Sequence, residues 1–92
     1  MRRMLVSPQM SQSLGRLLSR EGVVRLLTGL HDLPRQYDRF RRLRTPEDES
    51  LFLYFDAVAD GGQMHTFTFL IDDSTSPDHL IVTTYEHRSR PF

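Results

Sequence analysis

The spacing of apolar residues changes once along this chain, and that change constrains the fold more than any other feature. Before residue 45, apolar side chains recur every three or four positions, which is the repeat of one face of an α-helix. From Leu51 onward they alternate with other residues, which is the repeat of a β-strand. Helices followed by strands predict an α+β domain, in which the helices cover one face of an antiparallel sheet.

Two helices are predicted in the first half of the chain, after a short strand at Arg3–Ser7. Ser7-Pro8 is typical of an N-cap followed by proline at the first helical position. The two apolar stripes are Met10, Leu14, Leu17 and Leu18, then Val23, Leu26, Leu27 and Leu30. Gly22 lies between the stripes and is interpreted as the C-cap and turn of a helical hairpin. In the alternative, Gly15, Gly22 and Gly29 line one side of a continuous helix.

Three strands are predicted in the second half, at Leu51–Val58, His65–Ile71 and His79–Glu86. The segments between them, 59–62 and 72–78, are rich in Gly, Asp and Ser, so the strands form a meander. With the short first strand, this gives a three- to four-stranded antiparallel sheet under a helical hairpin. Residues 1–92 are predicted to form a single domain.

The pairing of the strands assigns side chains to two faces of the sheet. We assume a register in which the two residue numbers of each facing pair add to about 122 in the first hairpin and to about 151 in the second. In that register the side chains of one face pack under the helices. That face is Leu51, Leu53, Phe55, Phe67, Phe69, Ile71, Leu80 and Val82. The other face is Phe52, Tyr54, Thr66, Thr68, Leu70, Ile81, Thr83 and Tyr85. The second face is unusually apolar for a solvent face, so it is predicted to bind a ligand or to be covered by a strand, a terminal segment or a second copy in a homodimer.

The charges are unevenly distributed, although twelve basic residues balance twelve acidic ones. Residues 1–44 contain ten Arg and three acidic residues, and residues 45–92 contain two Arg and nine acidic residues. The absence of Lys excludes lysine acid–base and Schiff-base chemistry, and guanidinium groups favour forked contacts with carboxylates or phosphates. The alternative explanation for the use of Arg without Lys is a codon preference.

Several classes of protein are excluded by what the sequence lacks. Without cysteine there is no disulfide framework and no thiolate ligand or nucleophile. The longest apolar run, Leu51–Phe55, is far shorter than the roughly 20 residues of a membrane span, so no membrane association and a cytoplasmic location are expected. No Walker loop, G-x-S-x-G elbow or dinucleotide fingerprint occurs, and neither a cofactor nor a metal site is predicted.

The arginines are densest in residues 35–44, where Tyr37, Phe40 and Leu43 follow at threefold spacing. The basic residues of this segment are Arg35, Arg39, Arg41, Arg42 and Arg44. An amphipathic helix of this kind is predicted to contact a nucleic-acid backbone or a protein partner. The alternative is a solvated helix face that compensates the acidic second half.

The order of strand, helical hairpin and three-stranded meander resembles the RelE/ParE superfamily of bacterial toxins. The resemblance covers nearly the whole chain and is carried by Val6-Ser7-Pro8, Leu51–Val58, Phe67–Asp73 and Tyr85-Glu86-His87-Arg88. In RNA-cleaving members, the sheet carries basic residues that position the scissile phosphate, an acid/base pair, and often a tyrosine near the C-terminus. Gyrase-inhibiting members share the scaffold without that set.

The resemblance carries over to this sequence in part. Arg88 matches the basic residue that ends the last strand, and His65 falls near the basic position that opens the third strand. The strand Leu51–Val58 lacks the expected basic residues, and the chain ends in Phe92 where a tyrosine is usual.

The candidate catalytic residues are His65, Glu86, His87 and Arg88. The assumed pairing places His65 opposite Glu86, beside His87 and Arg88. An imidazole can act as acid and base, a carboxylate can orient it, and Arg can stabilise the charge of a phosphoryl transition state. The alternative is a surface ion pair between His65 and Glu86.

These observations predict a toxin-like domain of a toxin–antitoxin system that cleaves mRNA. The alternative is a non-catalytic interaction or inhibitor protein that binds an antitoxin or a target protein. In either case Tyr54 and Tyr85 on the sheet and the arginine-rich helix are the predicted binding residues.

Overall fold

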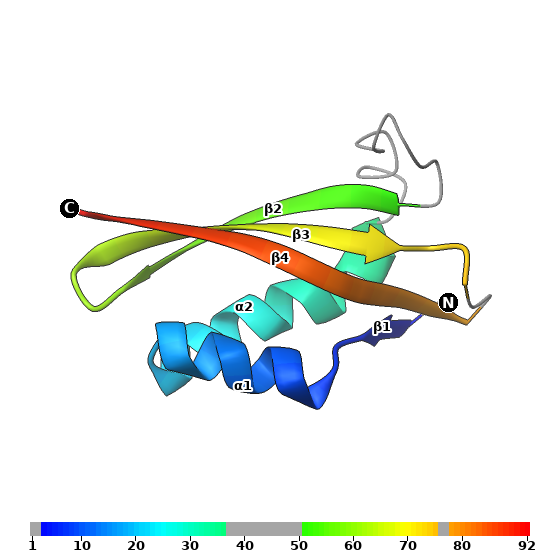
Figure 1. Ribbon diagram of the computed structural model, residues 1–92, viewed down its shortest axis with the longest axis horizontal. Coiled ribbons are helices and arrows are strands. Elements are labelled where there is room, and N and C mark those ends of the chain that lie inside the picture. The colour runs from blue at the N-terminus through cyan, green and yellow to red at the C-terminus, as the bar shows by residue number, and fades with distance from the viewer. Residues whose placement is uncertain (1–2, 37–50, 76–77) are drawn as a thin grey trace.

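The computed structural model describes residues 3–36, 51–75 and 78–92. The predicted α+β fold is confirmed, because two helices cover one face of a four-stranded sheet (Figure 1). The elements are β1 (Arg3–Leu5), α1 (Pro8–Leu17), α2 (Arg20–Asp32), the 3₁₀ turn η1 (Leu33–Gln36), β2 (Leu51–Asp60), β3 (Gln63–Asp72) and β4 (His79–Pro91). None of the described helices is long and apolar enough to cross a lipid bilayer.

The helical hairpin is confirmed, but its break lies earlier than Gly22. Leu18 is extended, with φ −126° and ψ 157°, and this residue ends α1. Ser19 then caps α2, because its hydroxyl accepts a hydrogen bond from the N–H of Gly22 at 3.3 Å. Ser7 caps α1 in the same way, ahead of Pro8. The assignment of Gly22 as a C-cap is therefore wrong, because a serine cap restarts the helix three residues before it.

The sheet is mixed, with strand order β1-β4-β3-β2, whereas a wholly antiparallel sheet was expected. β2, β3 and β4 form the predicted antiparallel meander, and β1 pairs in parallel with the start of β4, Arg3 opposite His79. The reason lies in the helices, which run in opposite directions and return the chain to the side from which β1 starts (Figure 1). β2 therefore runs in the same direction as β1, and so does β4, two strands later.

The turn between β2 and β3 fixes the register of β2. Gly61 and Gly62 have φ of 61° and 78°, so they form the two central residues of a tight hairpin turn, between the paired residues Asp60 and Gln63. Val58 consequently faces His65, one residue away from the expected pairing. A shift of one residue exchanges the two faces of a strand. Phe52 is thus buried under the helices and Phe55 points outward, the reverse of the prediction. Val58 is buried on the same face as Phe52.

A β-bulge in β4 sets the faces of the last strand. Leu70 pairs with Thr84, and Ile71 pairs with Val82, so Thr83 is the extra residue. The hydroxyl of Thr83 donates a hydrogen bond to the carbonyl of Leu70 at 3.0 Å, which helps to hold the bulge. Before the bulge, Leu80 and Val82 face the helices as predicted. After it the alternation is reversed.

The core lies between the helices and the inner face of the sheet. Its fully or nearly fully buried members are Met4, Met10, Leu14, Leu18, Leu26, Leu30, Leu33, Phe52, Val58, Phe67, Phe69, Ile71, Leu80 and Val82. Most of the predicted helical stripe is present, although Leu17 is exposed and Val23 and Leu27 are partly buried. Burial of these side chains is the main stabilising contribution, at roughly 1.5–3 kcal/mol for each large residue.

Two glycines allow α2 to approach β2 closely. A Cβ atom at Gly22 would lie 3.2 Å from Cγ of Asp60, and one at Gly29 would lie 3.1 Å from Oδ2 of Asp56. A Cβ atom at Gly15, on α1, would meet no atom within 4 Å. Gly22 and Gly29, seven residues apart, thus lie on the side of α2 that approaches β2. Gly15 does not take part in this close approach.

We predict that Gly22→Ala lowers the free energy of unfolding by about 1 kcal/mol, because the added methyl group presses on Asp60 and Leu18, and this outweighs the gain in helix propensity. Gly15→Ala is the matched control, and we expect it to raise that free energy by up to about 1 kcal/mol. Urea unfolding of both variants measures the difference. Equal effects of the two substitutions would contradict the close approach of α2 to β2.

Candidate binding site

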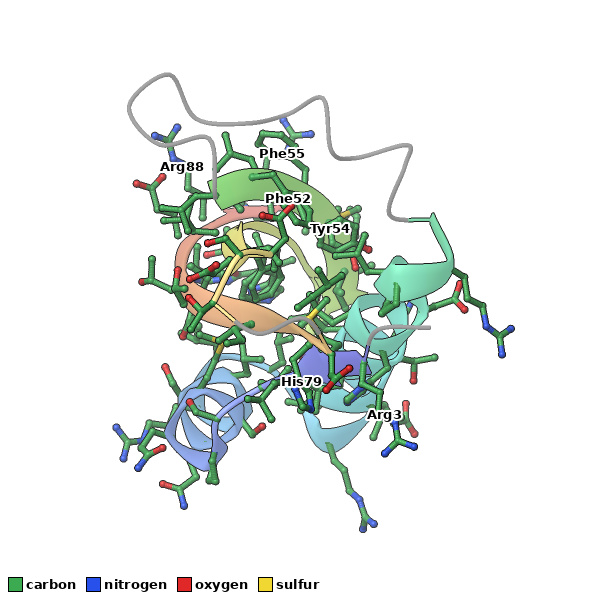
Figure 2. All side chains as sticks on the ribbon, turned by 90° about the vertical axis from the view of Figure 1, so that its right-hand side faces the viewer. Arg3, Phe52, Tyr54, Phe55, His79 and Arg88 are labelled. Carbon is green, nitrogen blue, oxygen red and sulfur yellow. The ribbon has the colours of Figure 1, made fainter. Side chains whose placement is uncertain are left out.

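The outer face of the sheet, which the helices do not cover, carries a shallow groove. Phe55 of β2 forms one wall, and Glu86 and Arg88 of β4 form the other. Figure 2 shows Phe55 and Arg88 on the side of the sheet away from the helices. The small side chains of Ala57, Thr66 and Thr68 form the floor between them, in a hollow of about 640 Å³. A second hollow continues past Thr66 and Arg88 toward Arg90. We call the first hollow the open-face groove.

Phe55 is the most conspicuous residue of the open-face groove. Its side chain is 55% exposed, although phenylalanine is usually buried. It points outward because the Gly61-Gly62 turn sets the register of β2, as described above. Sequence reasoning missed Phe55 and Ala57 as site residues. The signal was the Gly-Gly pair, since glycines suit the two positive φ angles of the tightest hairpin turn.

The four candidate catalytic residues are divided between the two faces of the sheet. The bulge turns Glu86 and Arg88 to the outer face and His87 to the inner face, where Phe67 is its cross-strand partner. His65 is also on the inner face and is only 8% exposed. The expected pairing of His65 with Glu86 is wrong, because Ser89 faces His65 and Thr68 faces Glu86. The structure therefore brings His65 and His87 into contact on the inner face, and it places Glu86 and Arg88 together on the outer face. A catalytic role of these residues stays a prediction.

The two histidines are in direct contact. Nδ1 of His65 lies 2.9 Å from Nε2 of His87, and the rings are stacked with an interplanar angle of 18°. Burial, and then the neighbouring His65, lower the pKa of His87. Within the described ranges, no three side chains of the metal-binding types meet in a group that could hold an ion.

The predicted binding tyrosines lie on the inner face, away from the groove. Tyr54 (Figure 2) and Tyr85 are half-buried and pack against the core. The hydroxyl of Tyr85 lies 2.5 Å from that of Ser13 on α1. The expectation that both tyrosines point outward is wrong for two reasons: the register of β2 reverses Tyr54, and the bulge reverses Tyr85.

The predicted arginine-rich helix lies mostly outside the described residues, which include only Arg35 of its five arginines. Arg35 belongs to η1 and forms an exposed ion pair with Asp32, at 3.8 Å. Exposed pairs of this kind contribute little to stability. Arg39, Arg41, Arg42 and Arg44 are not described.

Two aspartates at the strand ends are held ionised by hydrogen bonds. Asp60 accepts hydrogen bonds from the hydroxyl and the N–H of Ser19, at 2.5 and 2.7 Å, and these lower its pKa. Asp72 accepts hydrogen bonds from Thr75 and Ser74, and these lower its pKa as well. The first contact ties the β2–β3 hairpin to the start of α2, and the second closes the turn after β3.

The fold and the groove define an α+β domain with one sheet face that the described helices leave uncovered. No protein-family model matches the chain, and no match is found among curated proteins or solved structures. The resemblance to the RelE/ParE superfamily therefore stays a prediction.

We predict that Tyr54 ionises at unusually high pH. Burial, and then the charge of Asp56 and a hydrogen bond to it, raise the pKa of Tyr54 to about 12 from 10.0. The unfolded chain releases this proton near pH 10 while the folded chain keeps it, so the free energy of unfolding falls as the pH rises through this range. Phenolate absorbance during alkaline titration measures the effect. Tyr54→Phe should remove the absorbance step at the highest pH, and Tyr85→Phe should retain it. An absorbance step at this pH that persists in Tyr54→Phe would contradict the assignment.

Proposed function

We propose that this protein is a non-catalytic interaction domain that binds a protein partner through the open-face groove. The observation that carries the proposal is Phe55, an exposed aromatic side chain opposite Arg88 across a floor of small residues. Aromatic and arginine side chains are enriched at protein interfaces and among the few residues that dominate their binding energy. The floor of small side chains lets a partner approach the strand backbone.

The chemistry of the groove describes the segment that fits it. An apolar side chain of the partner would pack against Phe55, where it would be removed from water. Glu86 and Arg88 form the opposite wall and carry opposite charges, so they match a partner segment with one basic and one acidic side chain. In a toxin–antitoxin pair, such a segment would belong to the antitoxin or to the target protein.

The mixed charge of the groove favours protein over RNA. A phosphate backbone requires several cations and is repelled by carboxylates, and Glu86 stands beside Arg88 on the wall of the groove. RNA is nevertheless the second candidate ligand, because Arg88 and Arg90 extend along β4 beside Thr66 and could contact successive phosphates. If RNA is cleaved there, Glu86 and Arg88 would act without the two histidines.

We predict that Phe55→Ser weakens binding about tenfold or more, because it removes the apolar contact at the centre of the groove. The probe is a peptide selected for binding from a displayed random library, and its affinity is measured by calorimetry. Val24→Ser is the matched control, because Val24 is 56% exposed but lies on α2. Arg88→Gln should also weaken binding, and Arg25→Gln on α2 should leave it unchanged.

A peptide that binds Phe55→Ser and Val24→Ser equally would exclude the open-face groove as the binding site. The RNA alternative is tested in parallel with a single-stranded oligonucleotide. Cleavage that is lost in Glu86→Gln and Arg88→Gln would replace the proposal with the enzymatic function. Intact RNA together with retained peptide binding supports the proposed non-catalytic function.

A further inference from the structure

The His65–His87 pair lies at the end of the sheet where three strands and the helical hairpin meet. His65 belongs to β3 and His87 to β4, and Nε2 of His65 also lies 3.2 Å from the carbonyl oxygen of Asp60 at the end of β2. The carboxylate of Asp60 accepts the two hydrogen bonds from Ser19, between α1 and α2. The contacts form one chain through Ser19, Asp60, His65 and His87.

The partners of each nitrogen determine where the protons lie. A carbonyl oxygen can only accept, so Nε2 of His65 carries a hydrogen and donates it to Asp60. Neutral His65 then has a lone pair on Nδ1, and Nε2 of His87 must donate to it. In the neutral pair, both rings carry their hydrogen on Nε2.

The first added proton keeps every hydrogen bond of this arrangement, although the burial of His87 opposes its uptake. It binds Nδ1 of His87, and the resulting imidazolium still donates from Nε2 to Nδ1 of His65, now through a charge-assisted hydrogen bond. A second proton would have to bind Nδ1 of His65. Two N–H groups would then face each other across 2.9 Å, and two positive rings would be stacked.

We propose that the His65–His87 pair is a proton-operated clasp, which holds the end of β4 while it carries no more than one proton and releases it when it takes up two. β1 pairs with β4 only at residues 79–81, so β3 is the strand that holds the last residues of β4 among those described. Loss of the contact at His87 therefore weakens the attachment of β4 from His87 to Pro91.

One carboxylate, that of Asp60, is the compensating charge that the described contacts place near the pair. The titratable groups that the described contacts place near it are Asp60 from β2 and Tyr85 along β4. The carboxylate of Asp60 accepts two hydrogen bonds from Ser19, and it also attracts a positive charge on His65, whose Nε2 faces the backbone carbonyl of Asp60. The hydroxyl of Tyr85 is held by Ser13 of α1. Phe67 packs against His87 with a centroid distance of 4.8 Å and offers no charge.

The clasp predicts how stability changes with pH. The lowered pKa of His87 means that the folded chain binds protons less readily there than the unfolded chain, whose histidines titrate near 6.5. Stability is therefore complete above that pH and is lost as the pH falls below it. Each proton bound in excess by the unfolded chain raises the unfolding equilibrium constant tenfold per pH unit. The lowered proton affinity of His87 in this pair contributes up to one such factor.

The experiment compares urea unfolding of the isolated protein at pH 7.5 and at steps down to pH 5. We expect the unfolding equilibrium constant of His87→Gln to rise less steeply as the pH falls, by up to a factor of ten per pH unit. The reason is that glutamine can donate to His65 without titrating. His31→Gln is the matched control, since His31 is exposed on α2, and it should retain the wild-type slope. No binding partner is needed, so the result is independent of the proposed function.

Nitrogen NMR of the wild-type imidazoles and amide hydrogen exchange provide a second test that needs no substitution. We expect both rings to carry hydrogen on Nε2 at pH 7.5, and faster exchange at residues 87–90 than elsewhere in the sheet at pH 5. A pair that takes up two protons with unchanged exchange at the end of β4, or equal slopes for wild type and His87→Gln, would overturn the clasp.

Discussion

The register of β2 and β4 against β3 decides which side chains of this protein can meet. One residue of shift in β2, set by the Gly61-Gly62 turn, exchanges Phe55 for Phe52 in the core. One extra residue in β4, at Thr83, exchanges the faces of everything that follows it. The core, the groove and the histidine pair all depend on these two local features, because side chains alternate strictly along a strand.

β4 joins the two faces of the molecule. From Tyr85 to Arg88, alternate residues contribute to the core side and to the open-face groove, so the histidine contact and the groove wall share one stretch of backbone. β1 supports only the start of this strand. The position of Glu86 and Arg88 therefore depends on how firmly the inner side chains hold β4 against β3 and α1.

The end of the sheet near the hairpin turn is held mostly by polar contacts. Ser19 caps α2 and also binds Asp60, so one residue satisfies a helix terminus and fixes the hairpin. Gly22 leaves room for Asp60 to approach, which explains a glycine in the first turn of a helix. The opposite end of the sheet is held by apolar packing, because Leu30, Leu33 and Phe52 are fully buried there.

The periodicity of the sequence determined the α+β class, the helical hairpin, the meander and the inner residues of β3, because these depend on local spacing and on which residues avoid water. The faces of β2 and β4 were decided only in the tertiary structure. Periodicity shows that Glu86, His87 and Arg88 alternate, but it does not show on which side the alternation begins. Turn geometry and the bulge set that choice, and with it which charged groups can act together.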